Sequence, residues 1–218
     1  MNINLAVKEA SLILKKNSIK TSQLDSEILL GQVINKDREY IILNDDINIG
    51  KESYNYFKNL IEQRSKGKPI AYLIGKKNFW KDQFQINKHV LIPRPDTEII
   101  VEQVLKITKF QSNLRVLDIG IGSGCILLSV LREKKDFRGI GIDISKKSVE
   151  ISKLNALNLS LSHRVKIFKT NVDNFNYGKY DLIISNPPYI KKLDLKYLDK
   201  DVINFEPKQA LCGGLDGI

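Results

Sequence analysis

The stretch LDIGIGSGC, residues 117–125, joins a short apolar run to an amphipathic one. The apolar run that ends in it has the composition of a buried strand, and residues 123–134 carry apolar side chains at helical spacing. Between them, Gly120, Gly122 and Gly124 allow a tight turn and a close approach of the backbone to a ligand. The stretch therefore predicts a strand, a ligand-binding glycine loop and a helix.

The same alternation of apolar strands and amphipathic helices continues downstream. The predicted strands and helices alternate along the ranges 115–120, 123–134, 138–144, 145–159, 164–170 and 180–185. Near-continuous apolar strands separated by helices are typical of a parallel sheet that helices cover on both faces. This half of the chain is thus predicted to be an α/β domain with a Rossmann-like sheet.

The residues upstream have a different periodicity. Apolar residues recur at helical spacing in three segments, 5–16, 21–34 and 51–68, which predicts a small helical bundle. Residues 71–93 alternate apolar and polar side chains and predict a β-hairpin that turns at Lys81, Asp82 and Gln83. We therefore expect three parts: a helical domain over 1–68, a β-hairpin linker over 69–95, and a partial α/β domain over 96–218.

Composition and charge limit the class of protein. The chain has a net charge of +10, but no tight Lys/Arg cluster interleaved with aromatic residues, so the charge alone neither requires nor excludes nucleic acid. No apolar run approaches the roughly 18 residues of a membrane span. The first residues lack the layout of a signal peptide. The two cysteines have no zinc spacing. We expect a cytoplasmic protein without a metal site and without contact to a membrane.

The glycine loop does not match the phosphate-binding patterns. A dinucleotide loop has its third glycine one residue later, where this chain has Cys125, and no Gly-Lys-Ser/Thr follows. With Asp118 ahead of it, the loop resembles motif I of the S-adenosylmethionine-dependent methyltransferases. Asp143 ends the next predicted strand, where it could accept hydrogen bonds from both ribose hydroxyls. The resemblance implies S-adenosyl-L-methionine as cofactor, with Asn171 and Val172 (or Asp173) near its adenine. The residues expected to bind it are Asp118, Gly120, Ile121, Gly122, Ser123, Gly124, Asp143, Asn171, Val172 and Asn186.

The sequence SNPPYI, residues 185–190, follows the last predicted strand, and open α/β sheets bind ligands beyond the carboxyl ends of their strands. Methyl transfer to a planar nitrogen needs acceptors for its N–H bonds, because the lone pair is delocalised. The Asn186 side chain and the Pro187 main chain can each supply a carbonyl. Pro187 and Pro188 keep the segment extended, and Tyr189 can stack on the planar group. We expect catalysis by Asn186, Pro187 and Tyr189, and substrate binding by these three together with Pro188.

This motif resembles the N-P-P-Y signature of methyltransferases that act on adenine N6, guanine N2 or glutamine N5. Together with LIPRPDTEIIVE (91–102) and FEPKQALCGGLDG (205–217), it resembles the glutamine N5-methyltransferases of peptide-chain release factors. The resemblance implies methylation of the glutamine in the Gly-Gly-Gln motif of release factors, a reaction of translation termination. It also implies that the helical domain 1–68 recognises this protein substrate. Arg94 and Asp96 are expected to fix the joint between the domains, and the protein is expected to be a monomer.

Three alternatives remain open from the sequence. They are a methyltransferase for a ribosomal-protein glutamine, an N-P-P-Y-type nucleic-acid methyltransferase acting on adenine N6 or guanine N2, and a degenerate module that only binds the cofactor. The methyltransferase sheets that this chain resembles have more strands than the four predicted here. We therefore expect a fragment, a broken gene product or the front of a fusion. Such a chain would have an open apolar sheet edge and poor solubility or weak cofactor affinity on its own.

Overall fold

The structure is a computed structural model that describes residues 1–217. It divides into two compact units, a first unit of Met1–Ile74 and a second unit that begins at Gly75. Residue 218, the last of the predicted 96–218 domain, lies outside the described residues. No helix within residues 1–217 is long and apolar enough to cross a membrane.

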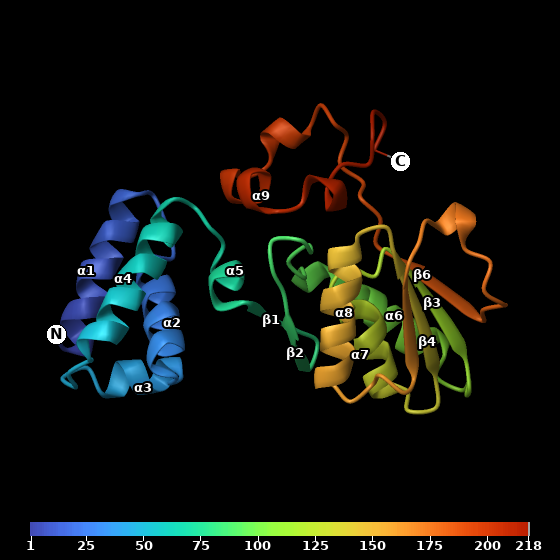
Figure 1. Cartoon of the computed structure of the whole chain (residues 1–218), viewed down its shortest axis with the longest axis horizontal. Coiled ribbons are helices and arrows are strands. Elements are labelled where there is room, and N and C mark those ends of the chain that lie inside the picture. The colour runs from blue at the N-terminus through green and yellow to red at the C-terminus, as the bar shows by residue number, and fades with distance from the viewer. Residues whose placement is uncertain (218) are drawn as a thin grey trace. The chain divides into compact units, whose positions relative to one another are not determined.

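The first unit is a bundle of helices. Its elements are α1 (Ile3–Lys16), α2 (Ser22–Ile34), α3 (Arg38–Leu43), α4 (Lys51–Ser65) and α5 (Ile70–Ile74). Helices α1, α2 and α4 pack side by side (Figure 1) and bury Leu14, Leu29 and Phe57 between them. The apolar stripes of the sequence predict these three helices. The sequence did not predict α3 and α5, which are too short to show a period.

Polar contacts fix the ends and the register of the bundle. The Asn2 side chain caps α1 by accepting from the Leu5 N–H at 2.9 Å, and the Asp37 side chain caps α3. A buried ion pair joins α4 to α2, with 2.8 Å between Arg64 Nε and Asp25 Oδ2. Because a buried charge without its partner is costly, this pair favours one register of α2 against α4.

A β-hairpin of β1 (Lys76–Phe79) and β2 (Asp82–Gln85) opens the second unit. Its turn lies at Trp80 and Lys81, earlier than the predicted Lys81–Gln83, because Asp82 already pairs with Phe79. The predicted linker 69–95 is divided between the units: α5 belongs to the first, whereas Phe79 and Phe84 are buried in the core of the second. The apolar face of the hairpin is therefore part of a folded core.

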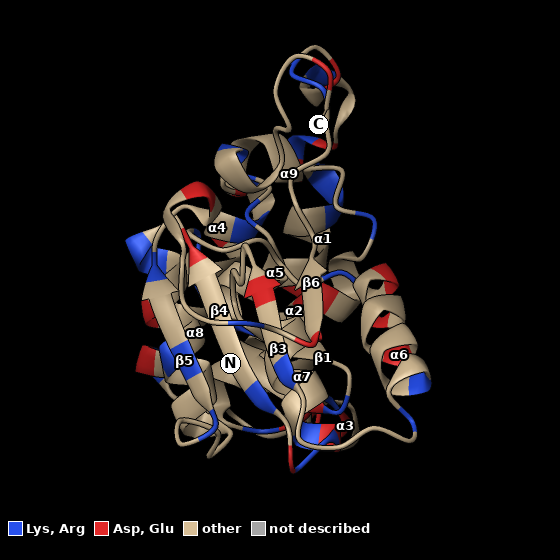
Figure 2. Ribbon diagram, turned by 90° about the vertical axis from the view of Figure 1, so that its right-hand side faces the viewer, with Lys and Arg blue, Asp and Glu red and all other residues tan. Residues whose placement is uncertain are grey.

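The centre of the second unit is a parallel sheet. Within residues 1–217 its strands are β3 (Arg115–Ile119), β4 (Arg138–Asp143), β5 (Val165–Lys169) and β6 (Leu182–Ser185), in the order β5-β4-β3-β6. Figure 2 shows them side by side in this order, with Lys and Arg spread over strands, helices and loops. Strand β3 pairs with β4 and β6 on its two sides. The predicted α/β fold with a Rossmann-like sheet is confirmed.

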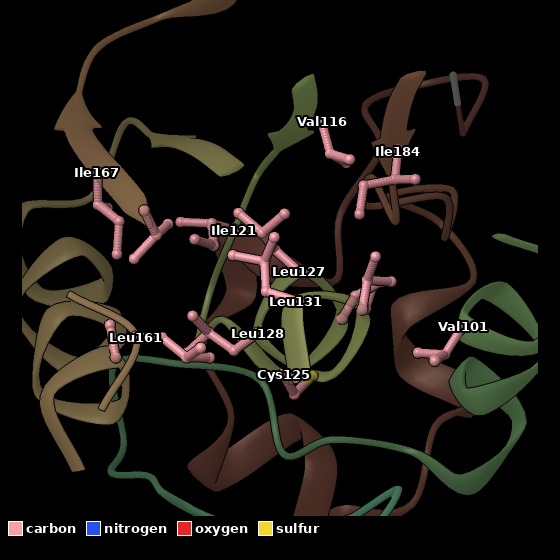
Figure 3. Close-up of a cluster of buried hydrophobic side chains, with 14 of the residues drawn as sticks. Val101, Val116, Ile121, Cys125, Leu127, Leu128, Leu131, Leu161, Ile167 and Ile184 are labelled. Carbon is pink, nitrogen blue, oxygen red and sulfur yellow. The ribbon is translucent and has the colours of Figure 1, made fainter. Parts of the chain in front are cut away.

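Helices α6 (Glu98–Ile107), α7 (Cys125–Glu133) and α8 (Lys146–Asn158) lie on one face of the sheet (Figure 1). Their apolar side chains and those of the strands form one core, in which Val101 of α6, Leu127 of α7 and Ile184 of β6 take part (Figure 3). The prediction that helices cover both faces was wrong for residues 1–217. The loop after β5 covers the other face instead, where Phe175 and Tyr180 pack around Leu117, Ile140 and Ile142.

The chain after β6 leaves the sheet and then folds back on itself. This segment contains η3 (Leu195–Tyr197), α9 (Lys200–Phe205) and η4 (Lys208–Ala210). Ile190 and Cys212 form a parallel bridge at its base, where the Ile190 N–H donates to Leu211 O at 3.1 Å. The residues between them thus form a closed excursion beside the carboxyl end of β6.

Candidate active site

The glycine loop between β3 and α7 has the backbone conformation for which glycine is suited. The φ angles of Gly120, Gly122 and Gly124 are +77°, +54° and +83°, in the left-handed region that other residues adopt at a cost. The N–H groups of Gly120 and Ile121 both donate to the carbonyl of Ile142 at 2.9 Å. These bonds hold the loop against the end of β4.

Close packing also fixes the position of the loop. A Cβ atom on Gly141 of β4 would come within 2.1 Å of the Ile121 side chain, and one on Gly124 within 2.9 Å of Leu128. Both distances are shorter than real Cβ contacts, so each glycine leaves the space that the neighbouring side chain fills. The loop therefore lies directly on the strand and on the helix that follows it.

Asp143, at the end of β4, faces the loop. Its Oδ2 accepts the Gly122 N–H at 3.0 Å, and its Oδ1 accepts the Ser145 N–H at 2.8 Å. A carboxylate has about four acceptor positions, so capacity for a ligand's hydroxyl groups remains. Asp143 also lines the cavity described below.

Asp118 has a different environment, although it lies only one strand away. It is 1% exposed, on the α7 side of β3, and among the described residues its Oδ2 has no hydrogen-bond partner. Burial raises the pKa of this carboxyl to about 7; the Leu127 N–H opposes the shift and the charge of Asp143 adds to it. Burial likewise raises the pKa of the Cys125 thiol to about 12, so this cysteine is not an activated nucleophile.

The SNPPYI segment continues directly from β6. The Ser185 hydroxyl donates to the carbonyl of Ile119 at 2.8 Å and so ties the ends of β6 and β3 together. Asn186, Pro187 and Pro188 follow at the carboxyl edge of the sheet and line the cavity.

The glycine loop, the end of β4 and the SNPPYI segment surround one cavity of about 270 Å³ at the carboxyl edge of the sheet. The predicted site residues that line it are Gly120, Ile121, Gly122, Ser123, Asp143, Asn171, Val172, Asn186, Pro187 and Pro188. Asp118 lies behind the loop, and Gly124 belongs to the loop but does not line the cavity. Tyr189 is 70% exposed and is not part of the wall. The structure thus brings most of the predicted residues together from four separate segments.

Sequence reasoning missed two further walls of the cavity. The chain from His89 to Arg94 forms one, and Pro207, Gln209 and Ala210 form part of the other. An ion pair joins these walls, with 2.6 Å between Arg94 Nη2 and Glu206 Oε1. The motifs around 91–102 and 205–217 marked these segments, but residue types alone did not show that they meet.

The Glu206 carboxylate also accepts a hydrogen bond from the backbone N–H of Ile92, in the other wall, at 3.3 Å. Its side chain is 2% exposed, whereas that of Arg94 is 38% exposed. Arg94 was expected to fix the joint between the domains. Its carboxylate partner instead lies within the second unit, at the cavity.

Comparison with known proteins identifies both halves of the chain. The PrmC N-terminal domain matches residues 6–75, and the methyltransferase small domain matches residues 96–206. A release factor glutamine methyltransferase of Buchnera aphidicola is 41% identical over 219 residues, which cover 100% of this chain and 78% of that protein. The chain belongs to the release factor glutamine methyltransferase family.

The chain is similar to further methyltransferases. The release factor glutamine methyltransferase of Clostridium acetobutylicum is 38% identical, over 100% of this chain and 78% of its own length. A bifunctional methyltransferase of Rickettsia felis is 35% identical, over 100% of this chain and 46% of its length. A crystal structure of an S-adenosylmethionine-dependent methyltransferase from Geobacter sulfurreducens aligns with 40% of this chain and 35% of its own, at 25% identity and a TM-score of 0.36.

Membership confirms the resemblance that the sequence motifs indicated, and it makes the chain a methyltransferase with S-adenosyl-L-methionine as cofactor. The residues of the cavity fit this cofactor. Asp143 offers acceptors for ribose hydroxyls, and the side chains of Ile121, Ile142 and Val172 give apolar surface for an adenine ring. The left-handed glycines leave the backbone of the loop uncovered by side chains, so that a ligand can approach it closely.

Proposed function

We propose that this chain transfers a methyl group from S-adenosyl-L-methionine to the side-chain amide nitrogen (N5) of the glutamine in the Gly-Gly-Gln motif of peptide-chain release factors. The observation that carries the proposal is the shared cavity: the cofactor loop and the Asn186–Pro188 segment line the same space. Relatives that are 41% and 38% identical over the whole of this chain are release factor glutamine methyltransferases by name. The chain is proposed to act in the cytoplasm, as a monomer, without a nucleic-acid requirement.

When bound, the cofactor supplies an electrophilic methyl group on a positively charged sulfur. The protein has to hold a weakly nucleophilic amide nitrogen in line with that methyl group. We assign the two N–H bonds of the amide to the side-chain carbonyl of Asn186 and the main-chain carbonyl of Pro187. Acceptors placed in this way orient the NH₂ group and favour the positive charge that develops on it during transfer. No separate base is needed, because the methylated amide loses a proton readily to water.

The remaining residues of the site have supporting roles in this proposal. Gly120 to Gly124 and Asp143 hold the cofactor, and Asn171 with Val172 contacts the adenine. Pro188 shapes the entrance. Tyr189, which is exposed beside the cavity, is proposed to stack on the incoming substrate loop, where its 70% exposed ring can reach a second protein.

The Asn186→Ala variant tests the assignment. We expect methyl transfer to a release factor to fall by a factor of about 10² to 10³, the usual loss when one preorganised polar group is removed. Binding of S-adenosylhomocysteine, measured by calorimetry, should persist in this variant. Asn176→Ala, at an exposed position outside the cavity wall, is the matched control and should keep full activity. Full activity of Asn186→Ala would refute the clamp.

A second experiment tests the substrate. The unaltered protein is incubated with labelled cofactor and, separately, a release factor, a ribosomal protein and a mixture of DNA and RNA. We expect label on the release factor, and none there after its glutamine is changed to alanine. Label on the ribosomal protein or on nucleic acid alone would replace the proposed substrate, and binding of cofactor without any transfer would indicate a degenerate module.

A further inference from the structure

Asn155, in the last turn of α8, has a buried side chain that the predicted site did not include. It is 1% exposed and lies next to Ala156 of the hydrophobic core. Its Oδ1 accepts the Gln85 N–H at 2.7 Å, and its Nδ2 donates to the carbonyls of Gln85 at 2.9 Å and Ser123 at 2.8 Å. Both donors and one acceptor position of this amide are therefore used.

Of the two partners of Asn155, Ser123 lines the cavity, whereas Gln85 lies four residues before the wall that begins at His89. Gln85 is the last residue of β2, and the chain continues from it to the wall formed by His89 to Arg94. Ser123 belongs to the glycine loop, between the left-handed Gly122 and Gly124. One side chain thus bonds to a segment 70 residues away and to another 32 residues away.

The Ser123 carbonyl depends on this side chain. The hydrogen-bond ladder of α7 begins one residue later, where the Leu128 N–H donates to Gly124 O at 2.9 Å. The Ser123 carbonyl therefore lies outside the helix, and Ser123 is buried, so its carbonyl has to find a partner other than bulk water. Asn155 supplies that partner and so fixes the peptide plane between the two glycines.

A purely structural brace would explain the burial and the three bonds, but it would not require that they converge on the cofactor loop. We propose that Asn155 is a positioning residue of the methyl-transfer site, which holds the glycine loop at a fixed separation from the segment that leads from Gln85 into the 89–94 wall. The proposal rests on the proposed function, since it gives this spacing a use in binding the cofactor. It places Asn155 behind the loop, out of contact with the reacting atoms.

Asn155→Asp is the informative variant, because aspartate has the same shape and keeps the acceptor for the Gln85 N–H. It loses both donors and turns an oxygen toward the carbonyls of Gln85 and Ser123. Asn158→Asp, an exposed position on the same helix, is the matched control for the added charge. Leu161→Ala, in the buried core just after α8, is the control for a general loss of stability without a change at the loop.

The first readout is amide hydrogen exchange of the cofactor-free protein, followed by mass spectrometry, at a temperature where every variant is folded. We expect exchange of residues 117–124 and 86–94 to become about tenfold faster in Asn155→Asp, as for the loss of a buried hydrogen bond. Neither control should change exchange in these two segments relative to the rest of the second unit. An even rise across the second unit, as expected for Leu161→Ala, would overturn the positioning role.

The second readout is the dissociation constant of S-adenosylhomocysteine, which we expect to rise about tenfold in Asn155→Asp and to stay unchanged in Asn158→Asp. Equal affinity in all variants would overturn the inference. If the unaltered chain does not bind S-adenosylhomocysteine, this result counts against the proposed function. Hydrogen exchange in the loop that still depends on Asn155 would then support the structural link that Asn155 makes.

Discussion

Asp118 and Asp143 show how two carboxyl groups on neighbouring strands can serve one loop in different ways. Asp143 is half-buried and accepts two backbone N–H groups, whereas Asp118 is buried behind the loop with one oxygen unpartnered in the described structure. Burial without full hydrogen bonding disfavours the ionised form. Asp143 can therefore act as an acceptor for the ligand, whereas the raised pKa of Asp118 makes the stability of the fold depend on pH.

The raised pKa of Asp118 predicts that this carboxyl group contributes more to the stability of the protein in mild acid than at neutral pH. The folded state holds this proton up to about pH 7, whereas the unfolded chain loses it near pH 3.8. Stability from this group is therefore fully present below pH 3.8 and is lost as the pH rises to 7, by up to about 4 kcal/mol. Urea unfolding at pH 5 and pH 8 measures the part of this loss that falls above pH 5, about 3 kcal/mol.

Asp118→Asn removes this titration while preserving the shape and the acceptor for the Leu127 N–H. The groups that face the carboxyl are Asp143, the Cys125 thiol and that N–H, and the variant leaves all three in place. We expect its free energy of unfolding to depend less on pH between 5 and 8 than that of the unaltered chain. Asp173→Asn, at an exposed position, is the control. Parallel pH profiles for Asp118→Asn and the unaltered chain would contradict the prediction.

The Arg94–Glu206 pair predicts an unequal response to the removal of either partner. Arg94→Ala leaves the buried Glu206 carboxylate without its cation. Because the Arg94 side chain is 38% exposed, we expect a smaller loss than the roughly 3–5 kcal/mol of fully buried pairs. Glu206→Gln removes the charge but keeps an oxygen for the Ile92 N–H, so it should cost less. Thermal unfolding ranks the two variants. The exposed pair Lys66–Glu62 is the comparison, and Lys66→Ala should change stability much less than Arg94→Ala. Equal losses for Arg94→Ala and Lys66→Ala would show that the cavity pair is not buried in solution.

The glycine loop packs against three neighbouring elements, namely β4, α7 and α8. Ile121 fills the space above Gly141, and Gly124 leaves room for Leu128 and for Ser152 of α8. Such packing transmits small shape changes, since protein interiors have few voids. The conformation of the loop is thus set by the sheet and two helices before any ligand binds.

Gly120→Ala and Gly124→Ala separate backbone strain from packing. Both positions have φ near +80°, so alanine costs about 1–2 kcal/mol at either. A Cβ on Gly120 meets nothing within 4 Å, whereas one on Gly124 meets Leu128 at 2.9 Å and has to displace it. We therefore expect Gly124→Ala to lower the free energy of unfolding by about 1–3 kcal/mol more than Gly120→Ala. Denaturant unfolding of the cofactor-free protein tests this, and equal losses would mean that Leu128 moves aside at no cost.

Periodic elements could be predicted from the sequence, whereas contacts between distant segments could not. The helices α1, α2 and α4 and the strands of the parallel sheet follow directly from apolar spacing. The hairpin turn did not, because Trp80 adopts a φ of +56° that its residue type does not signal. Tertiary contacts hold it there: the Trp80 N–H donates to Glu98 Oε1 at 2.7 Å and the indole N–H to Glu133 Oε1 at 2.8 Å.

The residues of the candidate site also fall into those that the sequence could predict and those that it could not. Gly120 to Ser123, Asp143 and Asn186 follow strand ends, so the rule that ligands bind at the carboxyl edge placed them together. Asn155, the 89–94 wall and the residues after Glu206 are held by bonds that span 32 to 114 residues. Neither periodicity nor spacing carries that information. The same limit explains why the loop over the second face of the sheet was not foreseen.

The two units of the molecule have separate hydrophobic cores, and the residues that line the cavity all belong to the second unit. Ligand binding stabilises only the parts of a protein that bind it. Under the proposed function, the first unit helps to hold the release factor. The two tasks, binding the cofactor and holding the protein substrate, should therefore respond to different substitutions.

Leu14→Ala tests this division, because Leu14 of α1 is fully buried in the core of the first unit. Loss of its side chain should destabilise that unit by about 2–5 kcal/mol, from lost burial and the cavity left behind. We expect the KM for the release factor to rise, because a loosened bundle holds the substrate less well. The dissociation constant of S-adenosylhomocysteine should stay unchanged, since no residue of the first unit lines the cavity.

Leu12→Ala, on the same helix but 60% exposed, should alter neither quantity. Weaker cofactor binding in Leu14→Ala would show that the units are energetically coupled, and an unchanged KM would remove the first unit from substrate recognition.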